Sequence, residues 1–176
     1  GHGHDKFQQI ASTEVRRANA PYFINWIGLG MAAPTLLAHG TEEQRKSFLP
    51  PIFSGEDIWC QGFSEPGAGS DLVSLQTSAV KDGDNWVVNG SKVWTSLGHF
   101  AKWMLLLART DKNDKYNGIT YFIASMEAQG VTVQPIHKMT GESGFNEVFL
   151  EEVVVPDHYR IDEVGKGWQV AMSTLT

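Results

Sequence analysis

The stretch Trp59–Asp71, WCQGFSEPGAGSD, is the most informative part of this chain for its fold. An apolar lead-in with two aromatic residues runs into Ser-Glu-Pro, then Gly-Ala-Gly, then Ser-Asp. Gly67 and Gly69 allow backbone conformations that are closed to other residues. Such a loop can bring backbone N–H groups and the hydroxyls of Ser64 and Ser70 against a polar ligand. Its glycines alone favour a plain turn between two elements.

A second segment, Lys92–Ser96 (KVWTS), places an aromatic ring beside two hydroxyls. The plane of Trp94 can hold a flat heterocycle by its face, and the hydroxyls of Thr95 and Ser96 can meet its polar edge. A buried core position is the default for a large aromatic residue. We expect that default for three other tryptophans: Trp26, Trp86 and Trp103.

Several kinds of site do not fit the first stretch. Gly67-Ala68-Gly69 lacks the third glycine of a dinucleotide fingerprint, and no Gly-Lys-Ser/Thr phosphate loop follows. The serines lie outside a Gly-x-Ser-x-Gly elbow, so nucleophilic catalysis is not expected. For Glu65 and Asp71, solvation and loop capping are more ordinary fates than acid–base catalysis.

Composition excludes further classes of function. The 176 residues carry a net charge of −6, and no basic run is longer than Arg16-Arg17, so we expect no nucleic-acid partner. The longest apolar stretches are too short or too interrupted to span a bilayer, so no integral membrane segment is expected. His2 and His4 suggest a metal ligand pair, but a flexible glycine loop is the simpler interpretation. We therefore predict no metal site.

The N-terminal part of the chain has a helical pattern. Residues 6–18 carry apolar side chains at spacings of three and four, and Pro21 closes this helix. A second helix is expected over residues 23–38, with packed faces formed by Trp26, Leu29, Gly30, Ala33 and Leu37.

A third helix is predicted by the capping box Thr41–Gln44, and we expect Pro50-Pro51 to stop it. The pattern then alternates, with tight turns at residues 82–85 and at Asn89-Gly90. Strands are predicted at residues 74–80, 86–88, 91–96, 104–109, 118–124, 131–136 and 147–153. Because no helices separate the strands, we expect an antiparallel sheet. A helix beginning after Gly165-Lys166-Gly167 completes an α+β chain.

Taken together, five segments resemble the acyl-CoA dehydrogenase family of flavoproteins, in the right order and with plausible gaps. They are AHGTEEQRKSFLPPIFSGE, WCQGFSEPGAGSDL, GDNWVVNGSKVWTS, FNEVFLEEVVVP and GKGWQVAM. The resemblance implies the end of an N-terminal helical domain (1–56) and a middle β-domain of barrel or sandwich type (57–160). It also implies the truncated start of a C-terminal helical domain (161–176), so we interpret the chain as a fragment.

The resemblance assigns roles to both motifs. Residues of the first would line FAD, with backbone groups of Phe63 and Ser64 at the pyrimidine edge of the flavin. Trp94 would lie against the flavin, and the Ser96 hydroxyl would reach towards N5. Ser70 would also contact the acyl-CoA. The family often has threonine at positions 64 and 96, and serine keeps the donor. The implied cofactor residues are Gln61, Phe63, Ser64, Gly69, Ser70, Trp94, Thr95 and Ser96.

The implied reaction is the α,β-dehydrogenation of an acyl-CoA thioester, in which a glutamate removes the α-proton and flavin N5 accepts the β-hydride. The family's catalytic glutamate lies beyond Thr176, so no catalytic residue is assigned and we expect the fragment alone to be inactive. Alternatives are an acyl-CoA oxidase, a relative of the flavin monooxygenase type, or a non-catalytic flavin- or CoA-binding module. The family also implies electron transfer flavoprotein as acceptor, a homo-oligomer, and the bacterial cytoplasm or mitochondrial matrix.

Overall fold

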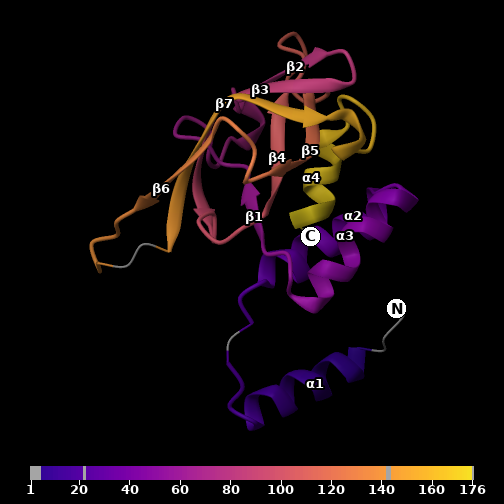
Figure 1. Ribbon diagram of the computed structural model, residues 1–176, viewed down its shortest axis with the longest axis vertical. Coiled ribbons are helices and arrows are strands. Elements are labelled where there is room, and N and C mark those ends of the chain that lie inside the picture. Colours follow the sequence, from indigo (N-terminus) through magenta and orange to yellow (C-terminus); the bar gives the residue numbers. More distant parts are fainter. Residues whose placement is uncertain (1–4, 22, 142–143, 176) are drawn as a thin grey trace.

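Helices form the N-terminal third of the protein and strands form most of the rest (Figure 1), which confirms the α+β class. The computed structural model describes residues 5–21, 23–141 and 144–175. The helical elements are α1 (Asp5–Arg17), the π-helical turn η1 (Gly28–Ala32), α2 (Ala33–His39), α3 (Glu42–Ser54), the 3-10 turns η2 (Leu72–Ser74) and η3 (Asp157–Tyr159), and α4 (Gly167–Leu175). Within these ranges, no helix is long and apolar enough to cross a membrane.

The strands form one sheet that is antiparallel at most of its pairings. They are β1 (Trp59–Gly62), β2 (Ser78–Asp82), β3 (Asn85–Ser96), β4 (Trp103–Arg109), β5 (Ile119–Ser125), β6 (Val131–Ile136), β7 (Phe145–Pro156) and β8 (Arg160–Ile161). Their order is β6-β7-β3-β2-β4-β5-β8, so the pairing does not close into a barrel. The expected antiparallel sheet is confirmed at most pairings, and the exceptions are the parallel pairing of β1 with β4 and a single parallel bridge between β2 and β4.

Alternate residues of β4 and β5 face two different apolar clusters. Leu105, Leu107 and Tyr121 pack with helical residues such as Leu36 and Ile52. On the other face, Met104, Leu106 and Phe122 belong to a second cluster. There they pack, as in a sandwich, with residues of β3 and β7: Trp86, Val148 and Val153. The central strands are therefore buried on both sides, and they form a rigid support for the segments at their ends.

The helix boundaries differ from the sequence prediction in two places. The capping box is confirmed, because Gln44 N donates to Thr41 Oγ1 at 3.2 Å and Thr41 N donates to Gln44 Oε1 at 3.0 Å. The stop at Pro50-Pro51 was wrong, since α3 continues to Ser54 and ends at Gly55 with a left-handed φ of 81°. Phe48 and Ile52 are buried on one face, and this packing holds the turn that contains the prolines.

The second helix is shorter than predicted: it spans residues 26–39 and includes the π-turn η1 near its start. Of the residues expected on its packed faces, Ala33 is buried, whereas the remainder lie on the outside of this segment: Trp26, Leu29, Gly30 and Leu37. Trp26 is 44% exposed, so its core assignment was wrong. Trp86 is buried as expected, and Trp103 is partly buried against the first cluster.

The predicted second turn at Asn89-Gly90 is also wrong. Residues 85–96 form one continuous strand, and the irregularity is a shift of register against β7 between Val88 and Gly90. Gly90 has a φ of 154°, and a Cβ there would lie 2.5 Å from Thr77 Oγ1. The glycine therefore serves a bulge and a close approach to residue 77, and not a hairpin turn. The strand expected at residues 74–80 begins later, at Ser78.

A buried asparagine joins the helical part to the sheet. Asn25 is 1% exposed, and its Nδ2 donates to the carbonyl oxygens of Asp57 at 2.9 Å and Ile52 at 3.3 Å. Its Oδ1 accepts from Trp59 N at 3.0 Å. One side chain thus connects the end of α3 to the start of β1, immediately before the first motif.

Replacing this side chain tests the connection. Asn25→Ala leaves three backbone groups without their partner, so we expect the free energy of unfolding to fall by about 2–4 kcal/mol. The change is measured by urea denaturation. Asn113→Ala, in the exposed loop between β4 and β5, is the matched control and should change stability by less than about 0.5 kcal/mol. Equal effects of the two substitutions would contradict this role.

Candidate functional site

The first motif folds into a tight loop directly after β1. Glu65 N donates to the carbonyl of Ala68 and Ala68 N donates to the carbonyl of Glu65, each at 3.0 Å. Neither Gly67 nor Gly69 has a positive φ, so the loop does not use the conformational freedom that these glycines allow. A Cβ at Gly69 would meet no atom within 4 Å, so the fold itself does not require glycine there. Open space beside Gly69 is what a closely approaching ligand needs.

Glu65 is the anchor of this loop. It is 7% exposed, and its carboxylate accepts from Gln76 N at 2.6 Å and from Thr77 N at 2.9 Å. Lys92 Nζ lies 2.8 Å from Glu65 Oε1. The capping expected for Glu65 and Asp71 is confirmed by these bonds and by the 2.5 Å bond from Ser74 Oγ to Asp71. Solvation holds for Asp71 alone, because Glu65 is buried.

Lys92 is fully buried and belongs to the second motif. Its Nζ also donates to the carbonyl oxygen of Phe63 at 3.1 Å. Burial lowers the pKa of Lys92 to about 8, against the opposing effect of Glu65. Burial alone would raise the pKa of Glu65, but the Lys92 charge and the hydrogen bonds to the carboxylate outweigh it and lower that pKa. Both groups are therefore charged together at neutral pH.

The second motif is an irregular part of β3. The register against β7 shifts between Lys92 and Thr95, and Trp94 has a φ of 61°. A left-handed backbone is unusual for an aromatic residue, and such strain persists only where the surroundings fix it. Val93 N donates to the Ser64 carbonyl at 2.9 Å, so this bulge is bonded directly to the first motif. The geometry leaves Trp94 57% exposed.

Asn146 on β7 holds the other side of the bulge. It is fully buried, and its Nδ2 donates to the Thr95 carbonyl at 3.0 Å. The same nitrogen lies 3.1 Å from His99 Nδ1. The Thr95 side chain is itself buried, so its hydroxyl does not face the protein surface.

The two motifs line a common groove of about 230 Å³. Its walls are Gln61, Phe63, Ser64, Gly69, Leu72, Val93, Trp94 and Leu175. Five of the eight predicted site residues are among them, and Ser70, Thr95 and Ser96 are not. This volume lies below the range of about 300–1,000 Å³ that is typical of ligand pockets. Leu175 comes from α4, at the end of the described chain.

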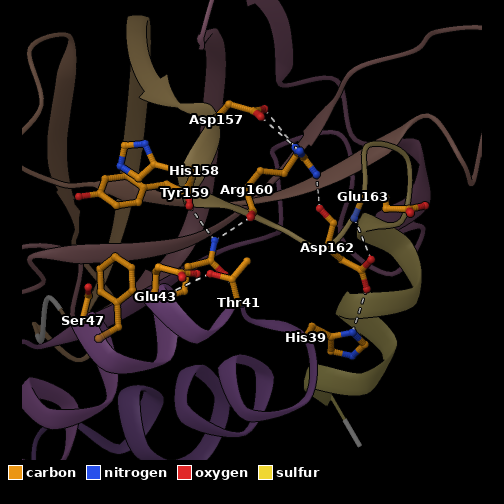
Figure 2. A pocket seen from close by; sticks show the side chains of 12 residues that line it. His39, Thr41, Glu43, Ser47, Asp157, His158, Tyr159, Arg160, Asp162 and Glu163 are labelled. Atoms are coloured by element: carbon orange, nitrogen blue, oxygen red, sulfur yellow. Dashed lines mark hydrogen bonds and ion pairs between the residues drawn. The ribbon is translucent and has the colours of Figure 1, made fainter.

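A larger cavity, of about 450 Å³, lies between α3 and residues 157–163 (Figure 2). Its polar groups bond one another: Gln44 Nε2 donates to the carbonyls of His158 and Arg160, both at 2.8 Å. His39 Nδ1 lies 3.1 Å from Asp162 Oδ2. None of the predicted site residues lines this cavity, so we interpret it as a joint between the helices and the end of the sheet.

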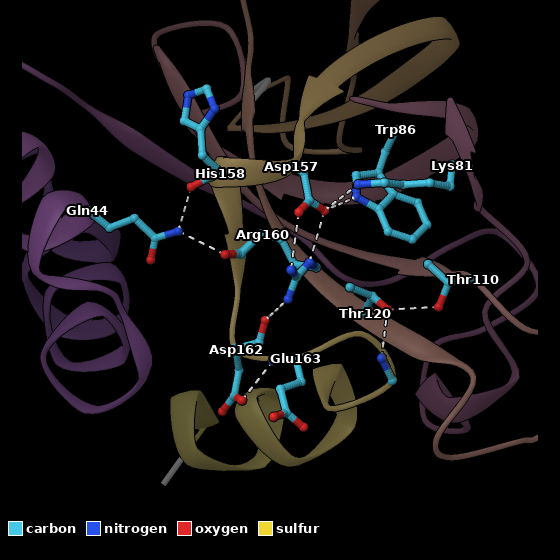
Figure 3. Close-up of polar contacts among 11 residues, drawn as sticks. Gln44, Lys81, Trp86, Thr110, Thr120, Asp157, His158, Arg160, Asp162 and Glu163 are labelled. Atoms are coloured by element: carbon cyan, nitrogen blue, oxygen red, sulfur yellow. Dashed lines mark hydrogen bonds and ion pairs between the residues drawn. The ribbon is translucent and has the colours of Figure 1, made fainter. Parts of the chain in front are cut away.

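Asp157 is the centre of the polar contacts beside that joint (Figure 3). Its carboxylate accepts from Arg160 Nε at 3.1 Å, from Trp86 Nε1 at 2.6 Å and from Lys81 Nζ at 2.8 Å. The hydrogen bonds from Arg160, followed by those from Lys81 and Trp86, hold the pKa of Asp157 well below its usual range. These bonds fix the end of β7 against β2 and β3.

Within the described ranges, no group of three His, Cys, Asp or Glu side chains could hold a metal ion. His2 and His4, the pair considered from the sequence, lie outside the described residues.

Comparison with known proteins identifies the family. Residues 60–153 match the family described as acyl-CoA dehydrogenase, middle domain, and residues 1–56 match acyl-CoA dehydrogenase, N-terminal domain. The chain belongs to the acyl-CoA dehydrogenase family. Acyl-CoA dehydrogenase IpdE1 of Mycobacterium tuberculosis is 46% identical over 164 residues, which cover 93% of this chain and 43% of that protein.

Solved structures share this fold. The ChsE4–ChsE5 complex from Mycobacterium tuberculosis matches with a TM-score of 0.85 and 39% identity, over 96% of this chain and 43% of that chain. The Tcur3481–Tcur3483 steroid ACAD matches with a TM-score of 0.84 and 38% identity, over 92% of this chain and 42% of that chain. The chain therefore spans less than half the length of these acyl-CoA dehydrogenase relatives.

Sequence reasoning missed the residues that support the acyl-CoA dehydrogenase motifs. Lys92 was quoted inside a motif without a role, Glu65 was expected only to be solvated or to cap the loop, and Asn146 was not considered. A signal for Lys92 exists in the sequence: a lysine inside an alternating apolar strand must find a carboxylate if it is buried. The first motif contains such a carboxylate, that of Glu65. No local pattern marks Asn146.

Removing the carboxylate of Glu65 should be costly. Glu65→Gln leaves Lys92 buried without its ion-pair partner, so we expect the free energy of unfolding to fall by about 3–5 kcal/mol at pH 7. Asp71→Asn, six residues further along the same motif at a mostly exposed carboxylate, is the matched control and should cost less than about 1 kcal/mol. Urea denaturation of both variants measures the difference. Similar losses of unfolding free energy in the two variants would show that the buried ion pair stabilises the protein no more than an exposed carboxylate does.

Proposed function

We propose that this chain forms one wall of the active site of an FAD-dependent acyl-CoA dehydrogenase that is longer than these 176 residues. The proposed reaction is the α,β-dehydrogenation of an acyl-CoA thioester. We further propose the division into the end of an N-terminal helical domain (1–56), a middle β-domain (57–160) and the start of a C-terminal helical domain (161–176). The family membership supports both proposals.

One observation carries the proposal: the loop of the first motif and the bulge of the second are bonded together beside a single groove. The Val93 N–H to Ser64 carbonyl bond and the shared groove walls support a common ligand for both motifs. Either motif alone would be compatible with an ordinary turn or an ordinary exposed tryptophan.

The residues present fit a flavin. Trp94 offers a flat, 57% exposed aromatic face, and its backbone is fixed by the bulge. Gly69 leaves room for close approach of a ligand. Ser64 lines the same groove, and its backbone N–H has no partner among the described residues; Ser96 follows the bulge on β3. FAD would supply the hydride acceptor when bound.

The roles of the residues follow from these positions. Trp94 would pack against the face of the ring system, and the main chain at Phe63 and Ser64 would orient its polar edge. The Ser96 hydroxyl would donate a hydrogen bond to the ring. Gln61, Gly69, Ser70 and Thr95 complete the proposed cofactor set, Thr95 without its buried hydroxyl, and Ser70 is also proposed to contact the acyl-CoA. The proton-abstracting glutamate is proposed to lie outside these residues.

Partners and location are proposed from the family. We propose an acyl-CoA substrate, electron transfer flavoprotein as acceptor, a homo-oligomeric assembly and a bacterial cytoplasmic location. A steroid-linked acyl chain belongs in the substrate panel, because the steroid ACAD named above is 38% identical over the shared region.

FAD affinity tests the role of the groove. In the full-length protein, Trp94→Ala should raise the dissociation constant of FAD about tenfold, equivalent to about 1.4 kcal/mol, because the ring loses an aromatic contact. Quenching of flavin fluorescence measures the constant. Trp26→Ala is the control, since Trp26 is a similarly exposed tryptophan outside the groove, and it should leave the affinity unchanged. An unchanged affinity in Trp94→Ala would contradict the proposed flavin face.

Anaerobic mixing of the FAD-bound full-length protein with a panel of acyl-CoA thioesters distinguishes a dehydrogenase from an oxidase and from a non-catalytic binding module. Bleaching of the flavin followed by slow reoxidation in air supports a dehydrogenase. Fast reoxidation with release of hydrogen peroxide would identify an oxidase instead, and a bound flavin that no thioester bleaches would indicate a non-catalytic module. The 176-residue chain with added FAD should not reduce an electron acceptor. Turnover by that chain would contradict the proposed position of the base.

A further inference from the structure

The peptide bond between Phe63 and Ser64 has a buried ammonium group at one end. Lys92 Nζ donates to the Phe63 carbonyl oxygen at 3.1 Å, and Lys92 is fully buried. Lys92 does not line the groove, whereas Phe63 and Ser64 do. The lysine therefore contacts this peptide from the protein interior and is not itself part of the groove wall.

The other end of the same peptide unit is the N–H of Ser64. The described residues contain no cis peptide bond, so the carbonyl and the N–H of this unit point in opposite directions. In the described part of the chain, the Ser64 N–H has no hydrogen-bond partner. The Ser64 carbonyl belongs to the next peptide unit and accepts a hydrogen bond from Val93 N, which fixes the orientation of that unit. The free N–H is thus held in place and directed away from Lys92.

We propose that Lys92 is a positioning residue that acts through the Phe63–Ser64 peptide, polarising the Ser64 N–H so that a flavin bound there is easier to reduce. This inference rests on the proposed function. A hydrogen bond accepted by a carbonyl strengthens the donor at the other end of the amide, and condensed-phase estimates of such cooperativity are about 10–30% per bond. A donor bonded to the ring stabilises the negative charge that a flavin gains on reduction.

The charge of Lys92 is balanced by a single carboxylate among the described residues, that of Glu65. Among the described residues, Glu65 is the charged group whose interaction with Lys92 shifts the lysine's pKa. The Glu65 carboxylate shares its charge between Lys92 and the backbone N–H groups of Gln76 and Thr77. Lys92 in turn makes a second bond, to Phe63 O, at which its charge polarises the peptide.

The effect should depend on pH. Burial lowers the pKa of Lys92 to about 8, although Glu65 opposes that shift. Below this value the ammonium polarises the peptide, and above it the neutral amine does so more weakly. The reduction potential of the bound flavin should therefore fall more steeply with pH around 8 than it does well below 8.

The first experiment measures the midpoint potential of FAD in the full-length protein between pH 6.5 and 9.5. At pH 7, Lys92→Met should lower the equilibrium constant for two-electron reduction about tenfold, which corresponds to about 30 mV. Lys102→Met is the matched control, because Lys102 pairs with Asp57 outside the groove, and it should not change the potential. Lys92→Arg keeps a charge that does not titrate, so it should retain the potential at pH 7 and remove the break near pH 8.

The second experiment needs neither FAD nor a substitution. In the FAD-free protein, the 15N and 1H shifts of the Ser64 amide should titrate near pH 8, which is decisive even if the variants do not fold. An amide that does not titrate, or an FAD-bound Lys92→Met variant with the wild-type potential, overturns this proposal alone. A wild-type protein that binds no FAD overturns the proposed function instead.

Discussion

The buried ion pair between Glu65 and Lys92 is the constraint on which the rest of the site depends. Glu65 belongs to the loop after β1 and Lys92 to the long strand β3, and the pair joins them at 2.8 Å. A buried charge is strongly unfavourable unless it is paired and hydrogen-bonded. Neither segment can therefore move away without leaving a charge unpaired in the interior, and this fixes the distance between the two motifs.

The groove is a consequence of that attachment. Lys92 is held in the interior by Glu65. The next residue, Val93, donates its N–H to the Ser64 carbonyl, and the bulge leaves Trp94 exposed to solvent. Asn146 holds the far side of the bulge through the Thr95 carbonyl. The strained backbone at Trp94 is thus fixed from two strands and one loop. Such preorganisation lets a flat ligand bind without first ordering the site.

The sequence predicted those features of the fold that depend on local chemistry. The Thr41–Gln44 capping box and the helix that begins at Gly165-Lys166-Gly167 are each determined by a few adjacent residues. The predictions failed where tertiary packing overrides local preference. Burial of Ile52 carries α3 past Pro50-Pro51, and the pairing of β3 with β7 turns the Asn89-Gly90 signal into a bulge. The parallel pairing of β1 with β4 follows from the crossing of the chain, which no local pattern shows. In the site, both motifs were recognised, but the pair that joins them spans 27 residues and was missed.

A double-mutant cycle on Glu65→Gln and Lys92→Met tests this account most directly. The free energy of unfolding is measured at pH 7 for the wild type, both single variants and the double variant. We predict that the double variant loses less stability than the sum of the two single losses, with a coupling energy of about 2–3 kcal/mol, because each single substitution leaves its partner unpaired. Additive losses, within about 0.5 kcal/mol, would contradict the claim that this pair holds the two motifs together.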